Sequence, residues 1–316
     1  QIYTDAGSDI FIEIQEYDRG FFSTRIKWRI RLNSQNLPAN VDEIVFIDQA
    51  EHGFGRVLSK TSLEENNWFK EFVDQKLNGT NPLDMMTEYT VFGNIKSTLS
   101  LNAFSFKDND DRVEMMPGKM LISIENGFNT VFSEMTWDGC SVPGKLNAGH
   151  LVFKSKIKKI STYIWDGDIS FSLETLKSSS EKKILELSKL FGNYTLNYNK
   201  EEQAISIDMG YGMESFQSGP DYIKKANIRV NLKNINAQAY EAFLKRYSEE
   251  MRKAMKEVTK GQQNPDIIKN AVEKHLSYLG IQEFGTYEKF LKKGFEVQIS
   301  DMSVQLHEGV VKGDIM

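Results

Sequence analysis

The chain has 316 residues, of which 26% are charged and 40% hydrophobic, and its formal net charge is −5. Acidic and basic residues are interspersed without a basic tail, which argues against nucleic acid as the main partner. A single cysteine, Cys140, excludes an intramolecular disulfide. No apolar run reaches the roughly 18 to 20 residues that a membrane-spanning helix needs. A chain of this length can bury a sizeable core in one elongated domain or in two.

The first predicted element is a β-hairpin over residues 10–32. Its return strand places four large apolar side chains on one face and four cations on the other: Ile26, Trp28, Ile30 and Leu32 against Arg25, Lys27, Arg29 and Arg31. This alternation with period two predicts a strand with one face on a core and the other in water. We interpret the cations as a solvated row paired with acids such as Glu13, the alternative being a surface for lipid phosphates or an acidic partner.

Strand patterns continue along the chain. In chain order they cover residues 43–48, 87–106, 119–125, 131–137, 145–154, 156–175 and 296–315. The Asp166-Gly167-Asp168 segment, flanked by alternating residues, predicts a hairpin turn. We expect these strands to form a long twisted antiparallel sheet, or several such sheets, in an elongated molecule.

Four segments predict helices that would cover this sheet. One runs over 62–77 from a capping box at Thr61, and a second follows the Ser178-x-x-Glu181 box, with apolar residues at helical spacing. The third covers 238–259, and the fourth runs from about 264 to 275 with a proline in its first turn. The predicted fold class is therefore α+β. A serine and charge cluster near 177–183 divides a strand-rich part, 1–176, from a mixed α/β part, 177–316, unless the two form one continuous domain.

Short motifs in the first hairpins carry a family resemblance. The turn of the first hairpin contains Tyr17, Arg19, Gly20, Phe22 and Ser23, and the hydrophobic strand 44–51 leads to His52-Gly53, followed by Phe54 where the family usually has proline. Met135 to Gly139 and the segment 228–240 agree in style. The chain resembles the YdgA-like bacterial family of unknown function over nearly all of its length.

The resemblance implies a periplasmic protein of the bacterial cell envelope, held at the inner membrane by an N-terminal hydrophobic segment. The chain begins with Gln1 rather than methionine, so we expect a signal peptide or anchor upstream. The resemblance carries over no catalytic residue. We interpret the motif residues as structural: Gly20 and Gly53 supply special backbone angles, while Tyr17 and Arg19 fix the turn. The alternative is a polar site, and in its catalytic form a hydrolase with a site near His52.

No cofactor or metal site is predicted, because the four histidines and the single cysteine show no ligand spacing. The predicted strands contain more apolar positions than the predicted helices could cover. The uncovered positions predict a cleft for an acyl chain, lined by Leu99, Leu101, Phe104, Ile169, Phe171 and Leu173. The resulting hypothesis is a non-enzymatic envelope protein that binds lipid or another amphipathic ligand along a curved sheet. The alternative is a homodimeric interaction module that associates through Tyr247, Met251 and Met255 on helix 238–259.

Overall fold

The computed structural model of the chain describes residues 10–32, 43–64, 67–79, 81–108, 110–180, 183–259, 274, 277, 291–306 and 308–315. The first half of this part contains β1 Ile10–Arg19, β2 Ser23–Leu32, β3 Glu43–Gly53, β4 Arg56–Leu63, α1 Asn67–Lys76, β5 Leu83–Thr90, β6 Ile95–Leu101, β7 Phe104–Asp108, β8 Asp111–Met115, β9 Gly118–Glu125 and β10 Thr130–Trp137. The second half contains β11 Cys140–Val142, β12 Leu146–Ala148, β13 Leu151–Lys159, β14 Trp165–Ser180, β15 Lys183–Asn199, β16 Ala204–Met213, β17 Ser215–Ser218, β18 Asp221–Asn236, α2 Ala237–Thr259, β19 Leu291–Leu306 and β20 Val310–Ile315.

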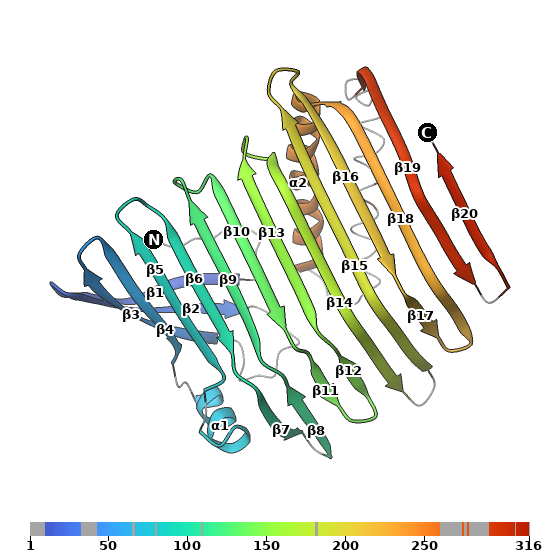
Figure 1. Cartoon of the computed structure of the whole chain (residues 1–316). Helices are drawn as coiled ribbons and strands as arrows, with labels where there is room; N and C mark the ends of the chain where they lie inside the picture. The colour runs from blue at the N-terminus through green and yellow to red at the C-terminus, as the bar shows by residue number, and fades with distance from the viewer. Residues whose placement is uncertain are drawn as a thin grey trace.

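All of these strands belong to one antiparallel sheet. Its main spatial order is β1-β2-β3-β4-β5-β6-β9-β10-β13-β14-β15-β16-β18-β19-β20, so most strands pair with their neighbour in the sequence. The short strands β7, β8, β11, β12 and β17 extend the sheet at one end of the long strands. Figure 1 shows β1 and β2 running across the direction of most other strands, as the twist of a many-stranded sheet produces.

The α+β prediction is wrong, because the described chain is nearly all sheet, and apart from two isolated helical residues, Lys274 and Ser277, the helices in it are α1 and α2. The helix predicted after Ser178 is absent. Ile184, Leu185, Leu187 and Phe191 lie instead in β15, where residues 183–190 pair with the end of β14. A short apolar run satisfies helical and strand spacing alike. The end of β14 was available as a pairing partner, and this favoured the strand over the helix.

Other predicted boundaries also moved. The chain remains in β4 as far as Leu63, so Thr61 pairs in the sheet and α1 begins only at Asn67. Asp166, Gly167 and Asp168 form no turn, because all three pair within β14 and the turn lies at 160–164. Glycine is required at position 167 by close approach: a Cβ there would lie 2.0 Å from the Lys156 carbonyl oxygen. The helix predicted over 264–275 lies outside the described residues, except for the helical Lys274.

Several predicted elements are confirmed, among them strands 119–125 and 131–137, which correspond to β9 and β10. The first hairpin pairs from Ile10 with Leu32 to Arg19 with Thr24. The long helix predicted over 238–259 is α2, which begins one residue earlier. The Asn236 side chain caps it by accepting a hydrogen bond from the Ala239 backbone N–H at 3.0 Å. In Figure 1, α2 lies behind the sheet.

The main core of the described chain lies where α2 packs on the sheet. Its buried residues are Ile164, Leu196, Ile205, Ile207, Ile235 and Ala237, with Tyr240 and Leu244 of α2 packed against them. A second cluster joins Val73 and Leu77, at the end of α1, to Phe104 and Phe106. Elsewhere most described side chains on both sheet faces are partly buried or exposed. Strand pairing therefore organises more of the molecule than a central core does.

The sheet continues across the predicted boundary near residue 177. β14 and β15 form a hairpin whose pairs run from Gly167 with Leu196 to Ser180 with Lys183. The division into parts 1–176 and 177–316 stays a prediction.

The first hairpin supplies a stability test. The Trp28 ring stacks on Phe46 at 4.3 Å between centroids, and its Nε1 donates to the Asp48 carboxylate at 2.8 Å. We expect Trp28→Ala to lower the free energy of unfolding by roughly 3 to 5 kcal/mol, as large truncations in packed sites do. Arg29 lies on the other face, 2.6 Å from Glu13, and Arg29→Ala should cost less than about 0.5 kcal/mol. Urea denaturation measures both, and equal effects would contradict the assignment of the two faces.

Candidate functional site

The rear face of the sheet, which is the side on which α2 lies (Figure 1), carries apolar side chains in continuous cross-strand rows. The row that we call row one consists of Met85, Leu99, Met120, Met135, Phe153, Phe171, Gly192, Tyr211 and Ile228. Row two, beside it, consists of Leu83, Leu101, Gly118, Trp137, Leu151, Leu173 and Leu190. Directly paired residues of an antiparallel sheet point to the same face. The two rows therefore form one apolar strip across β5–β15.

The structure brings together five of the six residues that the sequence predicted for an apolar cleft. Leu99 and Phe171 lie in row one, Leu101 and Leu173 lie in row two, and Ile169 lies on the other side of row one. All five are partly buried. Phe104 lies apart from them, because it packs in the cluster at the end of α1.

The residues that complete the rows were not predicted. Met120, Met135 and Phe153 connect Leu99 to Phe171, and Trp137 with Leu151 connects Leu101 to Leu173. The available signal was the alternation within the predicted strands 119–125 and 131–137. Placing these side chains beside the predicted ones requires the register of each hairpin, which alternation alone does not supply.

Glycines allow the aromatic side chains of these rows to lie against the backbone. A Cβ on Gly192 would lie 2.3 Å from Cε1 of Phe171 and 3.0 Å from Cδ1 of Tyr211. A Cβ on Gly118 would lie 3.1 Å from Cδ1 of Trp137. The rings thus occupy the space that these glycines leave, and the apolar strip continues without a gap at either position.

Two of the polar groups on this face lie in buried or half-buried surroundings. The Trp137 indole N–H is buried and has no hydrogen-bond acceptor among the described residues. At the α2 end, burial and a hydrogen bond with Tyr240 raise the pKa of Tyr194 above its ordinary value. The second contact ties the helix to the sheet. The rear face can therefore hold an apolar chain by contact area, and the Trp137 N–H is its one buried side-chain donor without a hydrogen-bond partner among the described residues.

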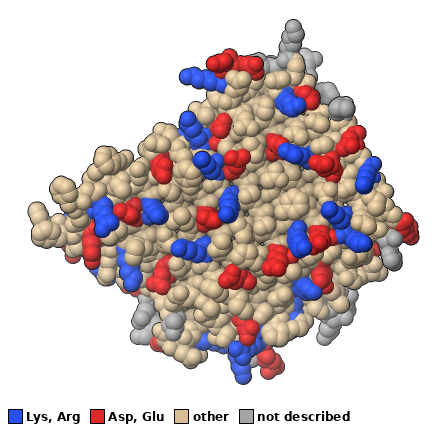
Figure 2. Space-filling model, viewed as in Figure 1, with Lys and Arg blue, Asp and Glu red and all other residues tan. Residues whose placement is uncertain are grey.

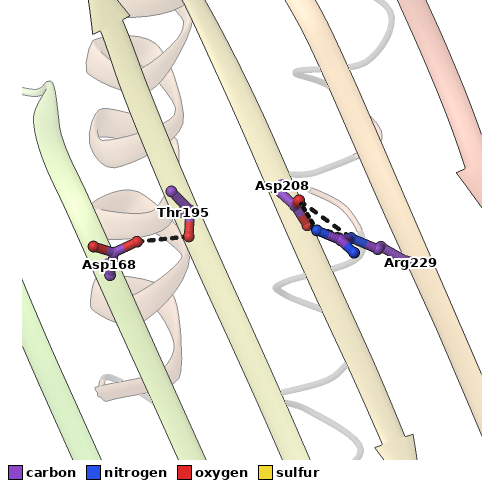
Figure 3. Close-up of polar contacts among 4 residues, drawn as sticks. All are labelled: Asp168, Thr195, Asp208 and Arg229. Atoms are coloured by element: carbon purple, nitrogen blue, oxygen red, sulfur yellow. Dashed lines mark hydrogen bonds and ion pairs between the residues drawn. The ribbon is translucent and has the colours of Figure 1, made fainter.

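The opposite, front face is charged, and Figure 2 shows acidic and basic side chains side by side across it. Arg229 binds Asp208 through Nε at 3.0 Å and Nη2 at 2.5 Å, and Thr195 donates to Asp168 at 2.7 Å (Figure 3). Lys154 pairs with Glu134 at 3.0 Å. No three His, Cys, Asp or Glu side chains of the described chain converge on a point where a metal could bind. The front face is a solvated ladder of ion pairs.

The family-motif residues meet where the first two hairpin turns lie side by side. The His52 backbone N–H donates to the Phe22 carbonyl at 2.8 Å, and its ring nitrogens lie 2.9 Å from the hydroxyl of buried Thr24 and 3.3 Å from the Phe21 carbonyl. His52 thus joins the two turns. Because both ring nitrogens face partners within the turns, this geometry favours a structural role over a hydrolytic site.

The other motif residues have simpler positions. Tyr17 and Phe22 are mostly exposed, and Arg19 pairs with Thr24 at the end of the hairpin. The interpretation of Gly20 and Gly53 as residues with special backbone angles is wrong, because the left-handed residue in this region is Gly55 at φ +79°. Gly20 serves close approach instead: its amide donates to the Ser23 carbonyl, and a Cβ would lie 3.1 Å from that oxygen.

The predicted dimer residues lie on α2. Tyr247 is 39% exposed and its ring lies 6.1 Å from that of Phe243, while Met251 is partly buried. The side chain of Met255 lies outside the described part of the chain. Association through this helix stays a prediction.

A model of the family "Bacterial protein of unknown function (DUF945)" matches residues 3–316, which is nearly the whole chain. No curated protein and no solved structure matches the chain. The described helices include none that is both long and apolar enough to cross a membrane.

The packing of Phe171 on Gly192 can be tested by adding one methyl group. We expect Gly192→Ala to lower the free energy of unfolding by about 1 to 3 kcal/mol, because the new Cβ collides with the ring and overpacked sites relax at that cost. Gly309→Ala is the control, since a Cβ there meets nothing within 4 Å. Chemical denaturation compares the two variants, and a neutral Gly192→Ala would show that the ring does not lie on the glycine.

Proposed function

We propose that this chain, which belongs to the DUF945 family of bacterial proteins, is a non-enzymatic protein that binds an acyl chain along the rear face of its sheet. The observation that carries the proposal is the strip formed by rows one and two. It runs across successive strands without a charged residue in either row. A surface of partly buried leucine, methionine and aromatic side chains matches the chemistry of a hydrocarbon chain.

The two faces of the sheet differ in a way that supports this assignment. The front face has cross-strand ion pairs, whereas the rear rows have apolar contact area and one buried indole donor without a partner among the described residues. Each methylene group that an acyl chain buries contributes about 0.8 kcal/mol. A chain of several methylenes along the strip would therefore offset the entropy lost on binding without any charged contact.

We place the protein in the bacterial cell envelope, facing the periplasm and attached to the inner membrane by an N-terminal hydrophobic segment. This placement is supported by the resemblance of the first turn and of His52-Gly53 to the YdgA-like family. It agrees with an amphipathic ligand, because membranes are the source of acyl chains.

A second candidate function is self-association through α2. It is favoured by the exposed ring of Tyr247, on the same helix as the partly buried Met251. Sedimentation velocity of the purified chain distinguishes this function, because a dimer without bound lipid would favour it over ligand binding.

Ligand binding is tested with a fluorescent fatty acid and two matched variants. Phe171 lies on Gly192 on the rear face, and Phe191, on the neighbouring strand, lies on Gly212 on the front face. We expect Phe171→Ser to raise the Kd of the probe about tenfold through lost apolar contact. Phe191→Ser should leave the Kd unchanged, although it removes the same side chain from the same kind of glycine contact.

The probe must first show saturable binding to the unaltered chain, and native mass spectrometry of the protein from cells should show bound lipid. Absence of saturable binding would refute the proposal. Equal weakening by the two substitutions would also refute it, because the effect would then come from stability rather than from the rear face.

A further inference from the structure

Four hairpin turns present exposed phenylalanine side chains along one edge of the sheet, the edge formed by the ends of the strands. The turns join β1 to β2, β3 to β4, β5 to β6 and β9 to β10, and in Figure 1 they follow one another along the same margin. The exposed fractions are 86% for Phe21, 74% for Phe22, 109% for Phe54, 83% for Phe92 and 58% for Phe128. Large apolar side chains that are exposed on successive turns form an apolar surface, and such surfaces mark sites of interaction with a protein or a membrane.

These turns are held together by hydrogen bonds from one to the next. The His52 amide donates to the Phe22 carbonyl at 2.8 Å, the Val91 amide donates to the Gly55 carbonyl at 3.2 Å, and the Asn126 amide donates to the Asn94 side chain at 3.3 Å. Gly55, Gly93 and Gly127 adopt positive φ angles that fix the turns themselves. The phenylalanines therefore belong to one ordered row, which we call the turn row.

The sequences of these turns set them apart from a later turn on the same edge. The turn segments are 20–22, 54–55, 91–94 and 126–129, and they contain only glycine, phenylalanine, valine and asparagine. The turn between β15 and β16, at 200–203, reads Lys-Glu-Glu-Gln. Both kinds of sequence make tight turns, so turn formation does not require the phenylalanines. The phenylalanines supply exposed apolar surface, which the charged turn at 200–203 lacks.

The spacing of the turn row indicates what it contacts. Adjacent strands lie about 4.8 Å apart, so turns that each join two strands repeat at about 10 Å, and four of them span about 30 Å. A protein interface concentrates its aromatic side chains in a packed centre. The rings stand one to a turn, or two in contact in the first turn, where the ring centroids of Phe21 and Phe22 lie 4.7 Å apart. Small groups of rings at intervals of about 10 Å suit instead a continuous apolar phase that accepts each group separately, as the interface of a bilayer does.

We propose that the turn row docks the protein on a lipid bilayer, with its phenylalanine rings inserted at the level of the headgroups. Charges just behind the turns come in both signs: Arg56 lies 3.6 Å from Glu88, and Arg25 lies 3.1 Å from Glu16. Docking is therefore driven by aromatic insertion rather than by attraction to anionic lipid, and it persists at high salt. The turn row and the rear face are separate surfaces, so docking does not depend on a ligand in rows one and two.

Vesicle flotation tests the docking surface. Vesicles of phosphatidylethanolamine and phosphatidylglycerol, and vesicles of phosphatidylcholine alone, should both carry the unaltered chain in low and in high salt. Phe54→Ser combined with Phe92→Ser should reduce the partition coefficient by about tenfold for each ring removed. Val310→Ser combined with Val311→Ser is the control, because these side chains are 52% and 61% exposed on β20, the last strand of the sheet, away from the turn row.

A second measurement places the turns in the membrane even if the serine variants are unstable. Phe92→Trp puts a fluorophore on the turn row, and Glu201→Trp puts one on the charged turn of the same edge. Vesicles of brominated phosphatidylcholine should quench the fluorescence added at position 92 and leave that added at position 201 unquenched.

Three results would overturn the proposal. One is failure of the unaltered chain to float with either kind of vesicle. Another is equal loss of flotation in the serine and control variants, which would show unspecific hydrophobic adsorption. The third is a dimer in solution that the Phe54→Ser and Phe92→Ser substitutions convert to a monomer, since the turn row would then be a contact between two copies of the chain.

Discussion

Antiparallel pairing between strands that are neighbours in the sequence is the constraint on which the rest of this structure depends. From β1 to β6, and again from β13 to β16, each strand returns beside the one before it. Short returns reduce the loop-closure entropy of each pairing and let the sheet grow by successive hairpins. They also mean that little of the described sheet is covered: α2 packs at one place and α1 at another.

This thin construction explains why the two faces differ so clearly. Along most of the paired strands, side chains alternate between a rear face that shares the core under α2 and a front face that carries most of the charged side chains. On the front face, exposed pairs such as Lys154 with Glu134 contribute at most about 1 kcal/mol each, so they keep the sheet soluble more than they stabilise it. On the rear face, Phe171 and Trp137 lie over glycines and extend the apolar surface beyond the core. An acyl ligand on that surface would cover apolar side chains that α1 and α2 leave exposed.

The turns follow from the same pairing. Because each hairpin reverses within a few residues, its turn must use left-handed or closely packed positions, which Gly55, Gly93 and Gly127 provide. In each of the four turns of the turn row a phenylalanine stands next to a glycine. Phe128 itself takes a positive φ angle of 68°. His52 links the first two turns, so the motif that resembles a known family lies at the base of the turn row.

The sequence by itself determined the first hairpin, most strands and α2, because period-two and period-3.6 patterns are properties of one segment. It also determined that Phe171 and Leu99 face the apolar side of their own strands. Only the tertiary structure decided that residues 184–191 are a strand, since the end of β14 offered them hydrogen-bond partners and their spacing fitted either state. It alone decided that Leu99 and Phe171 share a row, because the register between strands places Met120, Met135 and Phe153 between them. Register depends on turn lengths and on contacts between segments far apart in the chain, which no local pattern contains.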